Sequence, residues 1–117
     1  MTWVYKIADV SDWRSARDAG IYGGSVIDAA DGYIHLSTGK QLSETARRHY
    51  RGRSDLIVAR IDLARLEPAV RWEPSRGGDL FPHLYDVLPL ATVDSERPAR
   101  VSEEGQLIFV DGGPPWP

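Results

Sequence analysis

The alternation of apolar and polar residues predicts a chain built mainly from short strands. Residues 3–8 and 55–63 are rich in aromatic and β-branched side chains, which is typical of strands. In 55–63, apolar residues recur at every second position, so they share one face. Further strands are predicted at residues 33–37, 69–75, 81–90, 91–94, 99–102 and 107–111.

Two helices are predicted, both in the first half of the chain. Ser11 is a suitable N-cap for the first, and Gly20 is a suitable residue to end it. Thr38 and Gln41 have the spacing of a capping box, which predicts a second helix through roughly Tyr50.

The order of these elements predicts an α+β domain whose strands pair mostly antiparallel. Residues 21–32 contain several turn formers and no sustained period, so a loop is expected there. Two prolines in 81–90 favour an edge strand or an irregular crossing, because proline has no N–H to donate. We expect one domain over residues 1–111 and a flexible tail over 112–117.

Composition narrows the class of protein. The 117 residues are 42% hydrophobic and 26% charged, which is ordinary for a globular domain. The chain has no cysteine, which excludes disulfides, thiolate metal sites and a cysteine nucleophile. No apolar run approaches the roughly 20 residues that cross a membrane, and the first residues do not resemble a secretory signal. We therefore expect a cytoplasmic protein without a membrane partner.

A polar face on the strand at 33–37 provides the first candidate site. Tyr33, His35 and Ser37 alternate with two aliphatic residues and so should share one face. The strand leads into the helix predicted near Thr38, whose free backbone N–H groups favour an anion. These residues and Lys40 could converge on a phosphorylated ligand. The alternative is structural: Thr38 only caps the helix, and His35 is a partly buried imidazole.

A second candidate site lies in residues 71–86. Phe81, His83 and Tyr85 should point to one side of an extended chain. Glu73 follows Trp72, and a carboxylate beside bulky apolar groups can have a raised pKa that suits acid–base catalysis. His83 could serve as a general base, since histidine exchanges protons near neutral pH. The alternative for Glu73 is an ion pair with a nearby arginine.

Neither a metal site nor a nucleic-acid site is expected. Two histidines with Asp28, Asp31 or Glu73 would be a known type of ligand set, but no local spacing such as H-x-x-x-H supports one. The net charge is −3, whereas nucleic-acid-binding domains are usually basic. A basic patch that could contact RNA is more simply the solvated end of a helix. That patch consists of Arg47, Arg48, Arg51 and Arg53.

Several motifs resemble a family of small bacterial proteins, domain of unknown function 952. They are YKIA, W-x-x-A-x-x-x-G-x-Y-x-G-S, DGYIHLST-x-x-Q-L-x-x-T, RWE and FPHLYD-x-L, between about Val4 and Val93. The resemblance implies an ADP-ribosyltransferase-like fold, a compact α+β domain with a split antiparallel sheet. The order strand-HLS-helix, DLIVARIDL and VLPLATV is also similar to the catalytic half of tRNA 2′-phosphotransferases, which use NAD.

The resemblance also implies roles for some residues. His35 would hydrogen-bond a ribose hydroxyl or phosphate, and Ser37 with Thr38 would line the pyrophosphate or nicotinamide pocket. Tyr5 and Lys6 lie where such folds carry a first-strand histidine or arginine. Glu73 is the candidate for the catalytic glutamate of such transferases, although it lies earlier in the chain.

Together these observations predict a nucleotide-binding cleft that takes NAD and supports ADP-ribosyl or phosphoryl transfer. Glu73 and His83 are the candidate catalytic residues. The candidate binding residues are Tyr22, Tyr33, His35, Ser37, Thr38, Trp72 and Tyr85. Two alternatives stay open: a non-catalytic protein that binds a small anionic metabolite, and a protein-interaction module that uses residues 81–90 and the tail.

Overall fold

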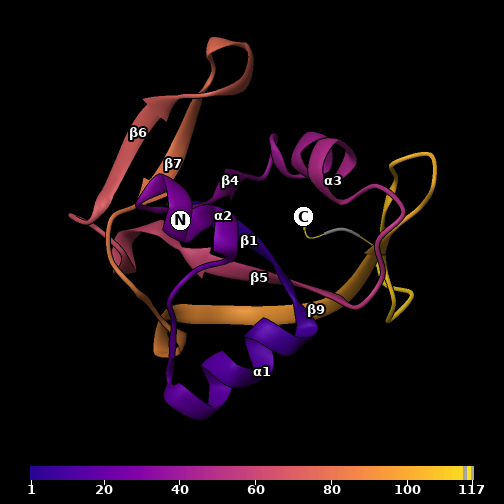
Figure 1. The fold of residues 1–117 in the computed structure, drawn as a ribbon, viewed down its shortest axis with the longest axis horizontal. Coiled ribbons are helices and arrows are strands. Elements are labelled where there is room, and N and C mark those ends of the chain that lie inside the picture. The colour runs from indigo at the N-terminus through magenta and orange to yellow at the C-terminus, as the bar shows by residue number, and fades with distance from the viewer. Residues whose placement is uncertain (115, 117) are drawn as a thin grey trace.

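A five-stranded antiparallel sheet forms the centre of the molecule in the computed structural model, which describes residues 1–114 and 116 (Figure 1). Its strands are β1 (Trp3–Asp9), β4 (Ser37–Thr38), β5 (Leu56–Asp62), β9 (Val93–Val101) and β10 (Leu107–Phe109). They follow the order β10-β9-β5-β1-β4, so the N-terminal strand lies inside the sheet.

Smaller antiparallel units pack beside this sheet. One has three strands in the order β3-β7-β6, and a two-stranded pair joins β2 to β8. Their bounds are β2 (Ile21–Tyr22), β3 (Ile34–His35), β6 (Val70–Pro74), β7 (Leu80–Leu84) and β8 (Leu88–Pro89). The helices are α1 (Val10–Ala19), α2 (Val26–Asp31) and α3 (Leu42–Tyr50), with 3₁₀ turns at Leu63–Arg65, Arg76–Gly78 and Leu90–Thr92. The prediction of one mixed domain with antiparallel pairing is confirmed.

Two apolar clusters cover the two faces of the five-stranded sheet. In the first, Trp13 and Ala16 of α1 pack with strand residues such as Val4, together with the inner face of the three-stranded sheet. In the second, Leu42 and Ala46 of α3 pack over the opposite face (Figure 1). The period-2 alternation of β1 and β5 therefore sends side chains into both clusters, because neither face of these strands is open to water.

The helix boundaries only partly match the sequence predictions. Helix α1 starts at Val10 with Asp9 as N-cap, so the prediction of Ser11 as its cap was wrong. Gly20 ends the helix in the left-handed conformation with φ of 78°, as predicted for a residue without a Cβ. The reciprocal hydrogen bonds between Thr38 and Gln41 are present, but they close a turn over residues 39–41, and α3 begins at Leu42 with Gln41 as its N-cap.

The loop predicted for residues 21–32 contains helix α2, so the first half of the chain has three helices and not two. Ser25 and Asp28 form a capping box, in which each side chain accepts a hydrogen bond from the other's backbone N–H. Six residues are too few to display helical periodicity, but the box satisfies the free N–H groups of the first turn.

Pro82 lies on the middle strand of the three-stranded sheet, although the prolines of residues 81–90 predicted an edge strand or an irregular crossing. Strand β7 pairs with β3 on one side and β6 on the other. The Pro82 carbonyl accepts a hydrogen bond from the Leu36 N–H at 3.1 Å, so the side of Pro82 that lacks a donor faces Leu36. Leu36 lies just beyond β3, which has only two residues. The hydrogen-bond ladder between β3 and β7 has ended there, so it requires no N–H donor from Pro82. Pro89 does lie in a two-stranded pair.

The predicted strand at 33–37 is interrupted at Leu36. His35 pairs with His83 in the small sheet, whereas Ser37 pairs with Tyr5 in the large one. The segments 91–94 and 99–102 were predicted as separate strands, but β9 runs without interruption from Val93 to Val101.

The C-terminal segment was predicted as a flexible tail over 112–117. Pro115 and Pro117 lie outside the described residues. The indole of Trp116 lies 5.4 Å from the ring of Tyr5 and 5.3 Å from that of Phe109, measured between ring centroids. In the described part of the chain, no helix has the length and apolarity needed to span a membrane.

Candidate functional site

The outer face of the three-stranded sheet carries a cluster of polar and aromatic side chains. Strand register pairs His35 with His83, and His83 with Arg71. Paired residues of antiparallel strands point to the same face, so these three side chains lie together. Ile34 and Leu84, one position away, point inward to the core. We call this outer face the His35 face.

Tyr33 lies at the centre of the His35 face. Its ring stacks on that of His83 at 4.0 Å between centroids. The rings of His35 and Tyr85 lie 4.7 and 5.2 Å from it. Tyr33 thereby covers His83, which is buried, and leaves His35 and Tyr85 partly open to solvent.

His35 is held between two carboxylates. Its Nδ1 lies 2.5 Å from Oδ1 of Asp28, and its Nε2 lies 2.9 Å from Oδ2 of Asp31. Asp28 is buried, whereas Asp31 is 46% exposed. Asp28 therefore fixes the orientation of the ring, while Asp31 can rotate into solvent and release Nε2 to a ligand.

Asp28 connects this histidine to the centre of the large sheet. Its Oδ2 accepts a hydrogen bond from the buried ammonium of Lys6 at 2.8 Å, and Lys6 also donates to the His35 carbonyl. Burial would raise the pKa of Asp28, but the hydrogen bond with His35 and the charge of Lys6 hold it well below its usual value. Burial lowers the pKa of Lys6, and Asp28 opposes that shift.

Helix α2 positions Asp28 through its first turn. The Ser25 hydroxyl accepts from the Asp28 N–H at 3.1 Å, and Asp28 Oδ2 accepts from the Ser25 N–H at 2.9 Å. Gly24 approaches so closely that a Cβ there would lie 2.8 Å from the Cβ of Asp28. Gly24 also has φ of 104°, which disfavours any side chain.

Glu73 is the second carboxylate centre of the face. Its Oε1 accepts from the Tyr85 hydroxyl at 2.6 Å and lies 2.9 Å from Nδ1 of His83. These two hydrogen bonds lower the pKa of Glu73 below its usual value. The prediction of a raised pKa was wrong, because Glu73 points to its hydrogen-bond partners and Trp72 points to the other face of β6.

The face also includes a cation. The guanidinium of Arg71 lies over the ring of Tyr85 at 4.7 Å. The hydrogen bond to Glu73 raises the pKa of Tyr85, so its hydroxyl stays protonated as a donor. Among the described side chains of this face, carboxylates outnumber guanidinium groups, so the exposed charge favours a cationic or hydroxyl-bearing ligand.

Five predicted site residues meet on the His35 face: Tyr33, His35, Glu73, His83 and Tyr85. Four others lie elsewhere. Ser37 is buried with its hydroxyl 3.0 Å from that of Thr45 in α3. Thr38 is occupied with Gln41, but it does not cap α3 as the structural alternative predicted, because the N-cap of that helix is Gln41. Trp72 projects from the opposite side of β6.

Tyr22 is the fourth residue that is not brought to the face. It is buried beside Trp13, with 5.3 Å between ring centroids. Its hydroxyl has no hydrogen-bond partner among the described residues. Lys6 lies between Tyr22 and the His35 face, with its ammonium 6.0 Å from the Tyr22 ring centroid and bonded to Asp28. Tyr22 therefore belongs to the core beneath α1.

The arginines of residues 47–53 are mostly engaged at the surface. Arg47 and Arg48 both bind Glu44 on α3, and Arg53 pairs with Asp9. This arrangement agrees with the solvated helix end that we considered. Within residues 1–114 and 116, no group of three or more histidine, aspartate or glutamate side chains could hold a metal ion.

Sequence reasoning missed the supporting residues of the site. Lys6 was considered only for its place on the first strand. Asp28 and Asp31 were considered only as candidate metal ligands. A signal was available for Asp28, because Ser25-x-x-Asp28 has the spacing of a capping box. A signal was also available for Lys6, which alternates with Val4 and Ala8 on an apolar face and so requires a buried partner.

Comparisons with known proteins place the chain in a family. The crystal structure of protein CC0527 from Caulobacter crescentus is similar with a TM-score of 0.87 and 38% identity, over 92% of this chain and 94% of that one. The solution NMR structure of CC0527 is similar with a TM-score of 0.80 and 40% sequence identity, over 91% of each chain. A search of curated proteins found no match. The model of the family "Protein of unknown function (DUF952)" matches residues 7–96. The chain therefore belongs to the DUF952 family.

Proposed function

We propose that the His35 face binds the nicotinamide-ribosyl part of NAD and promotes cleavage of the bond between nicotinamide and ribose. The observation that carries this proposal is the arrangement of His35 and Glu73 on either side of Tyr33. An imidazole oriented by Asp28 and a carboxylate oriented by Tyr85 and His83 meet there beside exposed aromatic rings.

Charge and shape favour this ligand. The nicotinamide ring of NAD is planar and cationic, and the faces of Tyr33 and Tyr85 offer electron-rich surfaces to such a ring. Lys6 offsets the charge of Asp28, so Asp31 and Glu73 provide the negative charge, with Arg71 beside them. A purely anionic metabolite would meet repulsion from both carboxylates.

The ribose hydroxyls would bind to His35 and Glu73. Asp31 is exposed enough to leave Nε2 of His35 when a ligand hydroxyl replaces it. Asp28 would keep the ring in place during that exchange, because its Oδ1 accepts from the His35 backbone N–H as well as facing Nδ1. The second carboxylate oxygen of Glu73 would accept a hydrogen bond from a ribose hydroxyl.

Glu73 would supply the electrostatic part of catalysis. When the bond between C1′ and the nicotinamide nitrogen breaks, its electron pair leaves with neutral nicotinamide and positive charge develops on the ribose. In hydrolysis, water then adds to C1′ and releases a proton to solvent. In a transfer reaction, the hydroxyl of an acceptor adds to C1′ instead and releases its proton to solvent. Glu73 is ionised because Tyr85 and His83 lower its pKa, and a fixed carboxylate stabilises such a charge. His83 is buried behind Tyr33, so its role is to position Glu73.

The fold is consistent with the same proposal. The chain has a five-stranded and a three-stranded antiparallel sheet, with His35 on the small sheet just before the chain enters the large one. This division supports the proposal, because an ADP-ribosyltransferase-like fold implies a split antiparallel sheet. Fold likeness alone does not carry a reaction, so the proposal depends on the residues of the His35 face.

The test is release of nicotinamide from NAD, followed by chromatography with purified protein. We expect turnover that falls by about 100-fold or more in Glu73→Gln, since one fixed stabilising group is removed. His35→Ala should lower turnover as well. Glu104→Gln, a matched change at an exposed glutamate, should leave it unchanged.

Two outcomes would overturn the proposal. One is the absence of nicotinamide release from the wild type at millimolar NAD. The other is turnover that persists unchanged in a folded Glu73→Gln protein, because the activity would then belong to another site or to a contaminant.

A further inference from the structure

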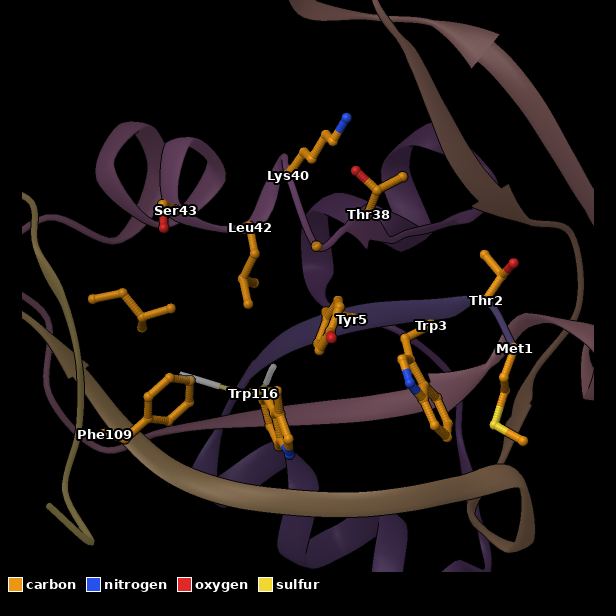
Figure 2. A pocket seen from close by; sticks show the side chains of 12 residues that line it. Met1, Thr2, Trp3, Tyr5, Thr38, Lys40, Leu42, Ser43, Phe109 and Trp116 are labelled. Carbon is orange, nitrogen blue, oxygen red and sulfur yellow. The ribbon is translucent and has the colours of Figure 1, made fainter. Parts of the chain in front are cut away.

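An aromatic slot lies on the face of the large sheet that α3 covers. It is a cavity of about 630 Å³ between the sheet and the turn that leads into α3 (Figure 2). Figure 2 shows the rings of Trp3, Tyr5, Phe109 and Trp116 along its floor and Leu42 on the opposite wall. Cavities of this size with mainly apolar walls are typical of small-molecule sites.

The floor of the slot is a fixed row of flat π surfaces. The guanidinium of Arg60 lies over Trp3 at 4.2 Å and over Trp116 at 5.4 Å. Arg97 lies over Phe109 at 3.9 Å and over Trp116 at 5.1 Å. Asp94 and Asp111 hold these arginines by ion pairs. A planar ring could therefore stack on a preformed surface.

Lys40 lies at the rim between the slot and the His35 face. It lines the slot and also a smaller cavity of about 240 Å³ that includes Phe81. In Figure 2 its ammonium points away from the ring floor, and it forms no ion pair among the described residues. Phe81 pairs in register with Glu73, so the smaller cavity adjoins the His35 face.

The separation of the two sites suits one elongated ligand. Thr38 lines the slot and follows His35 by three residues. Each extended residue advances about 3.3 Å, so their backbones are at most about 10 Å apart. A dinucleotide has two ring systems joined by phosphates, which would bring its anionic centre to the rim where Lys40 lies.

We propose that the aromatic slot binds the purine base of an adenine nucleotide and that Lys40 binds its phosphate. The inference rests on the proposed function for the identity of the whole ligand, in which the slot takes the adenosine half and the His35 face the other half. Trp3 and Trp116 stack on the base, and Ser43 of α3 lies on the wall opposite the rings (Figure 2).

The test is calorimetric titration of the full chain with AMP, adenosine and nicotinamide mononucleotide as separate probes. Trp116→Ala removes a stacking surface, and Ser43→Trp fills the slot from α3. Each should weaken AMP binding by about tenfold or more, within the range that loss of one base–aromatic stack produces. Lys40→Ala should weaken AMP binding and leave adenosine binding unchanged, because adenosine has no phosphate.

Matched controls separate local from general effects. Trp72→Ala removes an exposed indole outside the slot, and Arg14→Ala removes an exposed cation on α1. Neither should change AMP binding. Glu73→Gln should leave AMP binding intact and weaken only the binding of nicotinamide mononucleotide.

The outcomes for the two proposals differ. Absence of AMP binding at millimolar concentration, or AMP binding unaffected by both Trp116→Ala and Ser43→Trp, would overturn the slot inference whatever nicotinamide mononucleotide does. AMP binding lost in those variants, together with no binding of nicotinamide mononucleotide, would support the slot and count against the proposed function.

Discussion

The ammonium of Lys6 and the carboxylate of Asp28 form a buried ion pair, 2.8 Å apart and 22 residues apart in the sequence. It joins the middle of β1 to the first turn of α2. The same carboxylate fixes the ring of His35, so the orientation of the candidate site depends on a pair buried beneath it. The following predictions begin from this relationship.

Removing either charge should destabilise the fold. Lys6→Met leaves the Asp28 carboxylate without its ammonium, and Asp28→Asn leaves the ammonium buried without a counter-charge. Loss of one partner of a buried pair costs about 3 to 5 kcal/mol. Urea unfolding at neutral pH measures the change. A loss below about 1 kcal/mol in both variants would show that water reaches these groups.

The contribution of Asp28 should depend on pH with a definite sign. Its pKa in the folded protein lies below the ordinary value near 3.8. The unfolded state therefore takes up a proton first as the pH falls, so the stabilisation is complete above about pH 5 and declines below it. The stability difference between wild type and Asp28→Asn should narrow between pH 5 and pH 3. A difference that stays constant over that interval would contradict the assignment.

Gly24 and Gly23 offer a matched pair of substitutions. An alanine at Gly24 would need φ of 104° and would bring its Cβ within 2.8 Å of Asp28. At Gly23 a Cβ would meet nothing within 4 Å. Gly24→Ala should lower the free energy of unfolding by about 1 to 3 kcal/mol, while Gly23→Ala should have little effect. Equal melting temperatures for the two variants would count against the close approach.

Tyr85→Phe should raise the pKa of Glu73. The Tyr85 hydroxyl donates the hydrogen bond that contributes most to the lowered pKa of that carboxyl. A carbon-13 NMR titration of the Glu73 carboxyl would show the midpoint at higher pH in the variant. Tyr50→Phe, which removes a hydroxyl bonded to the Ile7 carbonyl instead, is the control. No movement of the midpoint in Tyr85→Phe would exclude this bond in solution.

Much of the site could be predicted from strand periodicity. Tyr33 and His35 are two residues apart, as are His83 and Tyr85, so each pair was expected on one face. The sequence could not reveal that β3 and β7 are neighbours, because pairing depends on the whole fold. Ser37 was misplaced for a related reason. The interruption at Leu36 moves the chain from the small sheet into the large one, and no local signal marks it.

The supporting elements were harder to predict. Helix α2 has six residues, fewer than two turns, so periodicity cannot identify it. Pro82 predicted an edge strand because proline has no N–H to donate to a neighbouring strand. That rule holds where both neighbouring strands continue past the proline, whereas β3 ends at His35, before the position opposite Pro82. The partner of Lys6 depends on long-range packing. Only a buried cation could be inferred from β1.

The central claim is that the His35 face binds the nicotinamide-ribosyl end of a nucleotide. It is tested most directly by NMR of the aromatic ring signals during titration with nicotinamide mononucleotide. We predict saturable shifts of the Tyr33, His35 and Tyr85 rings, with the Trp13 ring in the core unchanged. Ring signals on this face that stay fixed up to millimolar ligand would contradict the claim.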